Sequence, residues 1–201
     1  MNQYFTNDPD LAHDEHSFDF DLAGNALHFT ADNGVFSKHT IDYGSRVLIA
    51  VVAQAQPSGT LLDVGCGYGP IGLALAKADP SLQVTMSDVN QRALALAQRN
   101  AKANGIQNVT IIESAAYAAI TGHFDTIVTN PPVRAGKAVV SEILAGAWAH
   151  LNDGGQLYAV LQKKQGAPSA KKLLQETFGN AAVVKKDKGY YILQATKTAS
   201  V

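Results

Sequence analysis

The chain has 201 residues, of which 46% are hydrophobic and 16% are charged, and its 16 basic and 17 acidic side chains give a formal net charge of −1. This length suits one domain, or at most two small ones, with a core large enough to need no disulfide or metal for stability. A single cysteine, Cys66, excludes an intramolecular disulfide and argues against a cysteine-based metal site. The sequence contains no apolar run of about 18 residues, which argues against a membrane span.

The small net charge hides an asymmetry between two parts of the chain. Residues 1–133 carry 6 basic and 13 acidic side chains, whereas residues 134–201 carry 10 basic and 4 acidic ones. The total gives no overall attraction for nucleic acid, but the asymmetry predicts a surface with an acidic and a basic side. Residues 1–21 are polar and acidic, unlike a signal peptide, so we expect a cytoplasmic protein.

The first elements predict an extension that precedes the main fold. Apolar and polar side chains alternate in two short segments around a turn signal, which is typical of a half-buried β-hairpin. The expected elements, in chain order, are a polar arm or loosely docked start (1–16), a strand (17–22), a turn at Gly24-Asn25, a strand (26–30), a loop (34–37) and a helix (41–55).

From residue 60 onward, short apolar strands alternate with helices. The expected strands are 61–64, 82–87, 109–112, 124–129, 156–161, 182–186 and 190–195, and the expected helices are 71–78, 90–103, 137–150 and 170–178. This alternation predicts an α/β, Rossmann-like fold: a seven-stranded, mostly parallel sheet with helices on both faces, an antiparallel C-terminal strand pair and an N-terminal β-hairpin extension. We expect one domain, with the arm and hairpin in residues 1–33 and the core in residues 34–201.

A glycine-rich turn follows the first strand of the alternating region. Asp63-Val-Gly65-Cys-Gly67-Tyr-Gly69 leads from that strand into a helix. Glycines let the backbone turn with positive φ and approach a ligand, and the helix N-terminus attracts an anionic group. With Asp88 at the next strand end, the segment also fits the dinucleotide pattern GxGxxG, so the turn alone leaves an NAD-binding oxidoreductase open.

A second motif, Asn130-Pro131-Pro132-Val133, ends the strand at 124–129. The prolines fix φ and favour an extended backbone at Asn130. The Asn130 amide oxygen and a proline carbonyl can then both point into a cleft. Two fixed acceptors suit a planar amine donor and have no use in a dinucleotide dehydrogenase, so this motif favours methyl transfer.

Together these motifs resemble the class I S-adenosylmethionine-dependent methyltransferases. Within them the chain is similar to the methyltransferase small group, which includes the 16S rRNA guanine-N2 methyltransferases. Three further stretches carry the narrower resemblance: Gly34–Lys38, Pro132–Lys137 and Gln162–Ser169. The resemblance extends from about residue 4 to residue 197 and fits the short, single-domain members.

The resemblance implies roles for individual residues, with S-adenosyl-L-methionine as the cofactor. The cofactor would be held in three parts: its amino acid end by Asp63, Gly65, Gly67 and Gly69, its ribose by Asp88, and its adenine near Ser114, with Phe36 and Ser37 as a lip. Asn130 and Pro131 would hold the target amine, and Pro132, Val133, Arg134, Lys137 and Lys163 would contact the substrate. We expect no metal.

Two departures from the family pattern concern the adenine and the substrate. The family often has Asp or Asn after the third strand, whereas Ser114-Ala115 stands here, so only backbone contact with the adenine is expected. Relatives acting on bases often carry an aromatic residue after Asn-Pro-Pro, whereas Val133 stands here. Because the cofactor supplies the reactive methyl, we expect Asn130 to position and polarise the amine without deprotonating it.

The implied substrate is the exocyclic amine of a guanine in ribosomal RNA, free or in a ribosomal subunit. Lysines and arginines after residue 133 form the candidate RNA surface, with Arg134, Lys137 and Lys163 nearest the motifs. An adenine, a protein glutamine or a small molecule remains an alternative substrate, because Asn-Pro-Pro suits any planar amine. A non-catalytic cofactor-binding module and an NAD-dependent oxidoreductase remain alternatives of another class. The sequence leaves the oligomeric state open.

Overall fold

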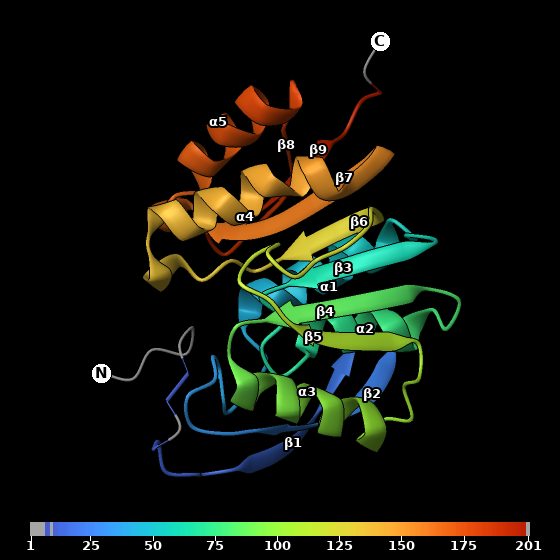
Figure 1. The fold of residues 1–201 in the computed structure, drawn as a ribbon, viewed down its shortest axis with the longest axis vertical. Helices are drawn as coiled ribbons and strands as arrows, with labels where there is room; N and C mark the ends of the chain where they lie inside the picture. Colours follow the sequence, from blue (N-terminus) through green and yellow to red (C-terminus); the bar gives the residue numbers. More distant parts are fainter. Residues whose placement is uncertain (1–6, 9, 200–201) are drawn as a thin grey trace.

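The computed structural model describes residues 7–8 and 10–199, and within them a seven-stranded sheet forms the centre of the fold (Figure 1). The sheet order is β5-β4-β3-β6-β7-β9-β8; the first five strands pair in parallel, and β9 runs antiparallel to both of its neighbours. The strands are β3 (Thr60–Val64), β4 (Gln83–Asp88), β5 (Val109–Glu113), β6 (Phe124–Thr129), β7 (Leu151–Gln162), β8 (Ala182–Asp187) and β9 (Tyr190–Thr196). The predicted fold class is confirmed.

Helices cover both faces of the sheet, so its central strands are buried on two sides. Leu61 packs with the three helices of one face, and its neighbour Leu62 packs with the two helices of the other. The first face carries α1 (Tyr43–Gln54), α2 (Pro70–Ala78) and α3 (Gln91–Ala103), and the second carries α4 (Lys137–His150) and α5 (Ala167–Phe178). No helix in the described part of the chain is long and apolar enough to cross a bilayer.

Most element boundaries lie within two residues of the sequence prediction, and the main differences are the starts of β7 and α5 and the turn of the hairpin. Strand β7 begins at Leu151, before the expected start at 156, because Gly154 takes φ +81 and the strand bulges there without ending. Helix α5 begins at Ala167, before the expected residue 170, since Pro168 is tolerated in a first turn where its missing N–H has no intrahelical partner. The turn of the N-terminal hairpin falls one residue earlier than expected, at Ala23 and Gly24.

That hairpin, β1 (His16–Leu22) and β2 (Asn25–Ala31), packs on α2 and α3 as an outer layer (Figure 1). Two asparagines one turn apart, Asn100 on α3 and Asn104 at its C-cap, bind the open edge of β2. Asn104 Oδ1 accepts from His28 N (2.8 Å) and its Nδ2 donates to His28 O (2.7 Å), while Asn100 makes the same pair with Thr30 (2.8 and 3.0 Å). The side-chain amides thus replace a missing strand and attach the hairpin in one register.

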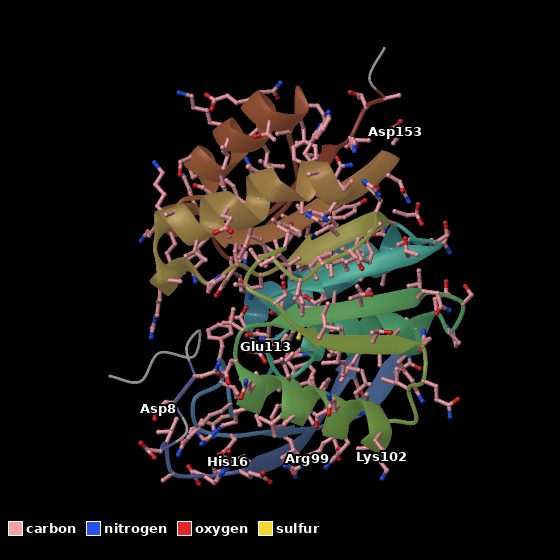
Figure 2. All side chains as sticks on the ribbon, in the orientation of Figure 1. Asp8, His16, Arg99, Lys102, Glu113 and Asp153 are labelled. Atoms are coloured by element: carbon pink, nitrogen blue, oxygen red, sulfur yellow. The ribbon has the colours of Figure 1, made fainter. Side chains whose placement is uncertain are left out.

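The described residues before the hairpin are tied to the same helix. The Arg99 guanidinium on α3 binds both carboxylate oxygens of Glu15, at 2.6 and 3.0 Å, and Figure 2 shows Arg99 and His16 in the region where α3 and β1 meet. Asp32, which is buried, accepts from Asp14 N at 2.6 Å. This part of the expected arm is therefore docked; residues 1–6 and 9 of that arm lie outside the described residues.

The two asparagines provide a matched test of the hairpin attachment. Asn100 is buried and also donates to Tyr68 O at 2.9 Å, so Asn100→Ala leaves backbone groups of half-buried Thr30 and buried Tyr68 unpaired. We expect it to lower the free energy of unfolding by about 2–3 kcal/mol, against about 0.5–1 kcal/mol for Asn104→Ala, whose partner His28 is exposed. Urea denaturation measures both; equal losses would contradict the role of Asn100.

Candidate active site

A cavity of about 490 Å³ opens at the carboxyl ends of the parallel strands. From β3 the chain proceeds to β4 on one side, whereas from β6 it proceeds to β7 on the other, so the order of connection reverses between β3 and β6. Val64 and Thr129, the last residues of these two strands, are register partners. Open α/β sheets bind ligands at such a reversal point, and here the glycine turn and Asn130 follow it directly.

The glycines of the turn divide into two kinds. Gly65 and Gly67 line the cavity at φ +74 and +56, and a Cβ on either would meet nothing within 4 Å. Gly69 does not line the cavity: a Cβ there would lie 2.7 Å from Leu73 Cδ1, and its φ is +106. The first two glycines leave room for a ligand beside the backbone. The missing side chain of Gly69 instead lets Leu73 of α2 lie close to the backbone of the turn.

Asp63 lies behind the turn and is fully buried. Its Oδ2 accepts a hydrogen bond from Gly72 N at 2.9 Å, while its Oδ1 is buried and has no partner among the described residues. The pKa of this carboxyl is raised to about 7, chiefly by burial; the Gly72 hydrogen bond opposes the shift, and the nearby Asp88 carboxylate adds to it. A buried carboxylate oxygen without a donor is the group that a cationic ligand would satisfy.

Asp88, at the end of β4, lines the cavity and fixes the turn. Its Oδ2 accepts from Gly67 N at 2.8 Å, and its Oδ1 accepts from Asn90 N at 2.9 Å. Burial raises the pKa of the Asp88 carboxyl, although the backbone donors of Asn90, Gly67 and Val89 act in the opposite direction. A carboxylate has about four lone-pair sites, so the group can still accept from a ligand hydroxyl.

The lip of the cavity is the loop between β2 and α1, from which Phe36 and Ser37 line the opening. Tyr68, a buried residue of the glycine turn, donates its hydroxyl to Ser37 O at 3.0 Å. Asn90, at the start of α3, donates to Gly34 O at 2.8 Å. The sequence did not single out Tyr68 or Asn90 for this task, because their partners lie more than 30 residues away.

Ser114 also lines the cavity, just after β5. Its hydroxyl donates to Ala116 O at 3.0 Å and accepts from Ala119 N at 3.1 Å. The side chain is thus committed to the turn that follows β5. Glu113, labelled in Figure 2, is the last residue of that strand and accepts from Gln91 Nε2 at 3.1 Å.

Asn130 is held by two residues that sequence analysis missed. Its Nδ2 donates to Asp42 Oδ2 at 3.1 Å and to Ser45 Oγ at 2.9 Å. Asp42 also caps α1 by accepting from Ser45 N at 3.0 Å. A carboxylate only accepts, so the contact with Asp42 identifies the NH₂ side of the Asn130 amide and leaves the amide oxygen as the remaining acceptor of this cavity-lining residue. The expected helix 41–55 included Asp42, so neither its capping role nor its contact with Asn130 was predicted from the sequence.

The two prolines after Asn130 differ in their carbonyl groups. Pro132 O accepts from Ala135 N at 2.9 Å within the short helix η1 (Val133–Ala135), whereas Pro131 O accepts no hydrogen bond from any described residue. Pro131, Pro132, Val133 and Arg134 line the cavity. Lys137, the first residue of α4, and Lys163, the first residue of the short helix η2 (Lys163–Gln165), are exposed and do not line it.

Comparison with known proteins gives the family. The model of the methyltransferase small domain matches residues 26–194. The uncharacterized protein YbxB of Bacillus subtilis is 45% identical over 96% of this chain and 98% of its own length. The ribosomal RNA small subunit methyltransferase C of Serratia proteamaculans is 35% identical over 81% of this chain, which spans about half (47%) of that relative's length.

A solved structure agrees. The T. thermophilus 16S rRNA N2 G1207 methyltransferase (RsmC), in complex with AdoMet and guanosine, superposes with a TM-score of 0.83 at 28% identity, covering 91% of this chain and 50% of that one. The fold, with its glycine turn at the reversal point, defines an S-adenosylmethionine-dependent methyltransferase. More narrowly, the chain belongs to the methyltransferase small domain family. The alternative of an NAD-dependent oxidoreductase is therefore set aside.

The residues present fit S-adenosylmethionine, which carries an ammonium group, a ribose and an adenine. The unpartnered Oδ1 of Asp63 suits a cation, the open side of Gly65 and Gly67 accommodates a ligand close to the backbone, and Asp88 can accept from hydroxyl groups.

The raised pKa of Asp63 predicts a specific pH dependence of stability. An unfolded Asp ionises near 3.8 and the folded one near 7, so the folded state holds the proton more tightly and loses stability as pH rises across this interval. Relative to Asp63→Asn, the parent's free energy of unfolding should fall by up to about 4 kcal/mol between pH 4 and 7. Urea unfolding of both proteins at several pH values measures this; a constant difference would contradict it.

Proposed function

We propose that this protein methylates the exocyclic amine of a guanine in the RNA of the small ribosomal subunit, in the cytoplasm. One observation carries the proposal: two acceptors, Asn130 Oδ1 and Pro131 O, belong to residues that line the same cavity as the glycine turn and have no bonding partner among the described residues. A planar amine has two N–H donors, and two acceptors complement them. The names of relatives support guanine and ribosomal RNA.

In the proposed complex the cofactor supplies an electrophilic methyl group on a sulfonium. Asp63 binds the cofactor's ammonium and Asp88 its ribose hydroxyls. The backbone at Gly65 and Gly67 lies against the amino acid part of the cofactor. Gly69 acts indirectly, by allowing the first turn of α2 to pack beside the glycine turn. Phe36 and Ser37 cover the cofactor, and the backbone at Ser114 borders the adenine.

Asn130 and Pro131 act on the target amine. Each accepts one of its hydrogens, which fixes the nitrogen so that its lone pair points out of the base plane toward the methyl group. A positioned pair of this kind can supply much of the rate enhancement, because proximity and alignment together are worth up to ~7–11 kcal/mol in favourable cases. The C–N bond forms as the S–C bond breaks, and the resulting cationic nitrogen then releases its proton to water, so no strong base is required.

Substrate specificity depends on the residues that follow Asn130 and Pro131 at the opening of the cavity. Pro132 and Val133 provide apolar contact for a base, and Arg134 lines the cavity, where it would bind a phosphate of the flanking RNA. Lys137 and Lys163 do not line the cavity but are exposed, and would bind phosphates farther from the target nucleotide. A protein glutamine or a small molecule carrying a planar amine remains the second candidate, favoured by the aliphatic Val133 where a stacking ring would suit a base. An adenine remains an alternative because Asn-Pro-Pro suits any planar amine.

Mapping of modified nucleotides tests the substrate. Mass spectrometry of small-subunit RNA from a strain lacking the gene should show one guanosine without its N2-methyl group, and the parent gene should restore it. An unchanged map, or a methyl group missing from adenosine or from a ribosomal protein, would contradict the guanine assignment.

Variants test the residue roles. Asn130→Ala should lower the rate of methyl transfer at least about 100-fold, because the amine loses its alignment, with the calorimetric affinity for S-adenosylhomocysteine unchanged. Asp42→Ala and Ser45→Ala each remove one tie to Asn130 and should lower kcat by a smaller factor without changing that affinity. A parental rate in Asn130→Ala, or lost cofactor affinity in all three variants, would refute these assignments.

A further inference from the structure

A basic and aromatic surface lies beside the cavity, on the side of α1 and β9. We call it the rim surface and define it by Tyr43, Arg46, Lys163, Lys188 and Tyr190. Tyr190 also lines the cavity, so the rim surface is continuous with the site of the proposed reaction. Lys163 and Lys188 are exposed, and the other three residues are half-buried.

The rim surface is assembled from three segments that are fixed to one another. Lys163 N donates to Gly189 O at 2.8 Å, which joins η2 to the turn between β8 and β9. Gln162 Nε2 donates to the Tyr190 hydroxyl at 2.8 Å. A Cβ on Gly44 would lie 2.7 Å from the Tyr190 ring, so the start of α1 packs directly on that ring. The surface is therefore preformed.

Its aromatic rings and cations interleave. The rings of Tyr43 and Tyr190 lie 5.8 Å apart, centroid to centroid. Lys188 Nζ lies 4.7 Å and Arg46 Cζ 4.8 Å from the Tyr43 ring centroid. None of Arg46, Lys163 and Lys188 forms an ion pair within the described residues, whereas Lys172 on α5 pairs with Glu176. The three cations of the rim surface thus have no ion-pair partner among the described residues.

We propose that the rim surface binds the single-stranded RNA that flanks the target nucleotide, with phosphates at Lys163, Lys188 and Arg46 and a neighbouring base against Tyr43 and Tyr190. This inference rests on the proposed function and adds the path that the RNA takes across the protein surface. Cations supply phosphate contacts, and exposed ring area supplies stacking without sequence preference. A strand held there delivers one nucleotide past Tyr190 into the cavity.

The rim surface draws on both parts of the chain. Tyr190 packs against the core and also lines the cavity. Arg46 and Tyr43 come from the acidic first part of the chain yet belong to the basic surface. The α5 lysines Lys171 and Lys172, by contrast, contribute nothing to the cavity lining.

The turn at Lys188 permits a clean variant. Lys188 takes φ +45 and Gly189 takes φ +83, positions that Asn-Gly fills well, so Lys188→Asn removes the charge and suits the turn better than lysine does. Ala23→Asn places the same residue at the matching position of the other hairpin turn, at φ +48, without a charge change. Lys171→Gln removes one exposed charge away from the rim surface.

The test measures binding of a labelled single-stranded RNA of about 10 nucleotides and mixed sequence to the full chain with S-adenosylhomocysteine, by fluorescence anisotropy across a salt series. Lys188→Asn should reduce the slope of log Kd against log salt by about 0.7 and weaken binding about fivefold at ~0.1 M salt. Tyr43→Leu should weaken binding with an unchanged slope, because stacking does not release counterions. Ala23→Asn and Lys171→Gln should match the parent.

Two outcomes would overturn the inference. If Lys188→Asn leaves the slope unchanged, or if Lys171→Gln reduces it equally, the rim surface is not the RNA path; the nucleotide map can still stand, so the proposed function survives that result. If the methyl group goes to a ribosomal protein instead of RNA, the map fails and both proposals fall. Misfolding would weaken RNA binding whether or not a variant removes a charge. A change of slope in Lys188→Asn but not in Tyr43→Leu therefore reports on binding contacts and not on loss of the fold.

Discussion

The contact of the Asn130 amide with Asp42 and Ser45 is the interaction on which the rest of this site depends. It joins the end of β6 to the start of α1, two segments more than 80 residues apart. By taking up both N–H groups of the amide it determines which atom remains as an acceptor. The same helix start packs on Tyr190 through Gly44, so one element fixes both the reactive acceptor and the entrance to the cavity.

The sheet supplies the second constraint. Because parallel strands end at one edge, the reversal of connection between β3 and β6 brings the glycine turn and Asn130 together without any long loop. Within the turn, packing and ligand space divide among the glycines: Gly69 is needed where Leu73 approaches, while Gly65 and Gly67 stay open to the cavity. Asp63, behind the turn, binds Gly72 N, and Asp88, in the cavity lining, binds Gly67 N, so the two carboxylates fix the turn from two sides.

Sequence patterns were sufficient for the elements and the sheet class, because alternation of strands and helices follows local periodicity. They were insufficient where a residue acts through a distant partner: the contacts of Asp42 with Asn130 and of Tyr68 with Ser37 join segments that are far apart in the sequence. The starts of β7 and α5 were missed for a local reason, because a bulge and a first-turn proline can each be mistaken for the end of an element. The near-zero net charge likewise concealed Arg46, a basic residue of the acidic part that lies with Lys188 around one ring.

The most direct test of this account is a crystal structure of the protein with S-adenosylhomocysteine and guanosine. The account predicts the guanosine amine nitrogen at about 2.7–3.2 Å from both Asn130 Oδ1 and Pro131 O, with the Asn130 NH₂ still on Asp42 and Ser45. A base bound with its amine directed away from these two oxygens, or an Asn130 amide released from Asp42, would contradict it.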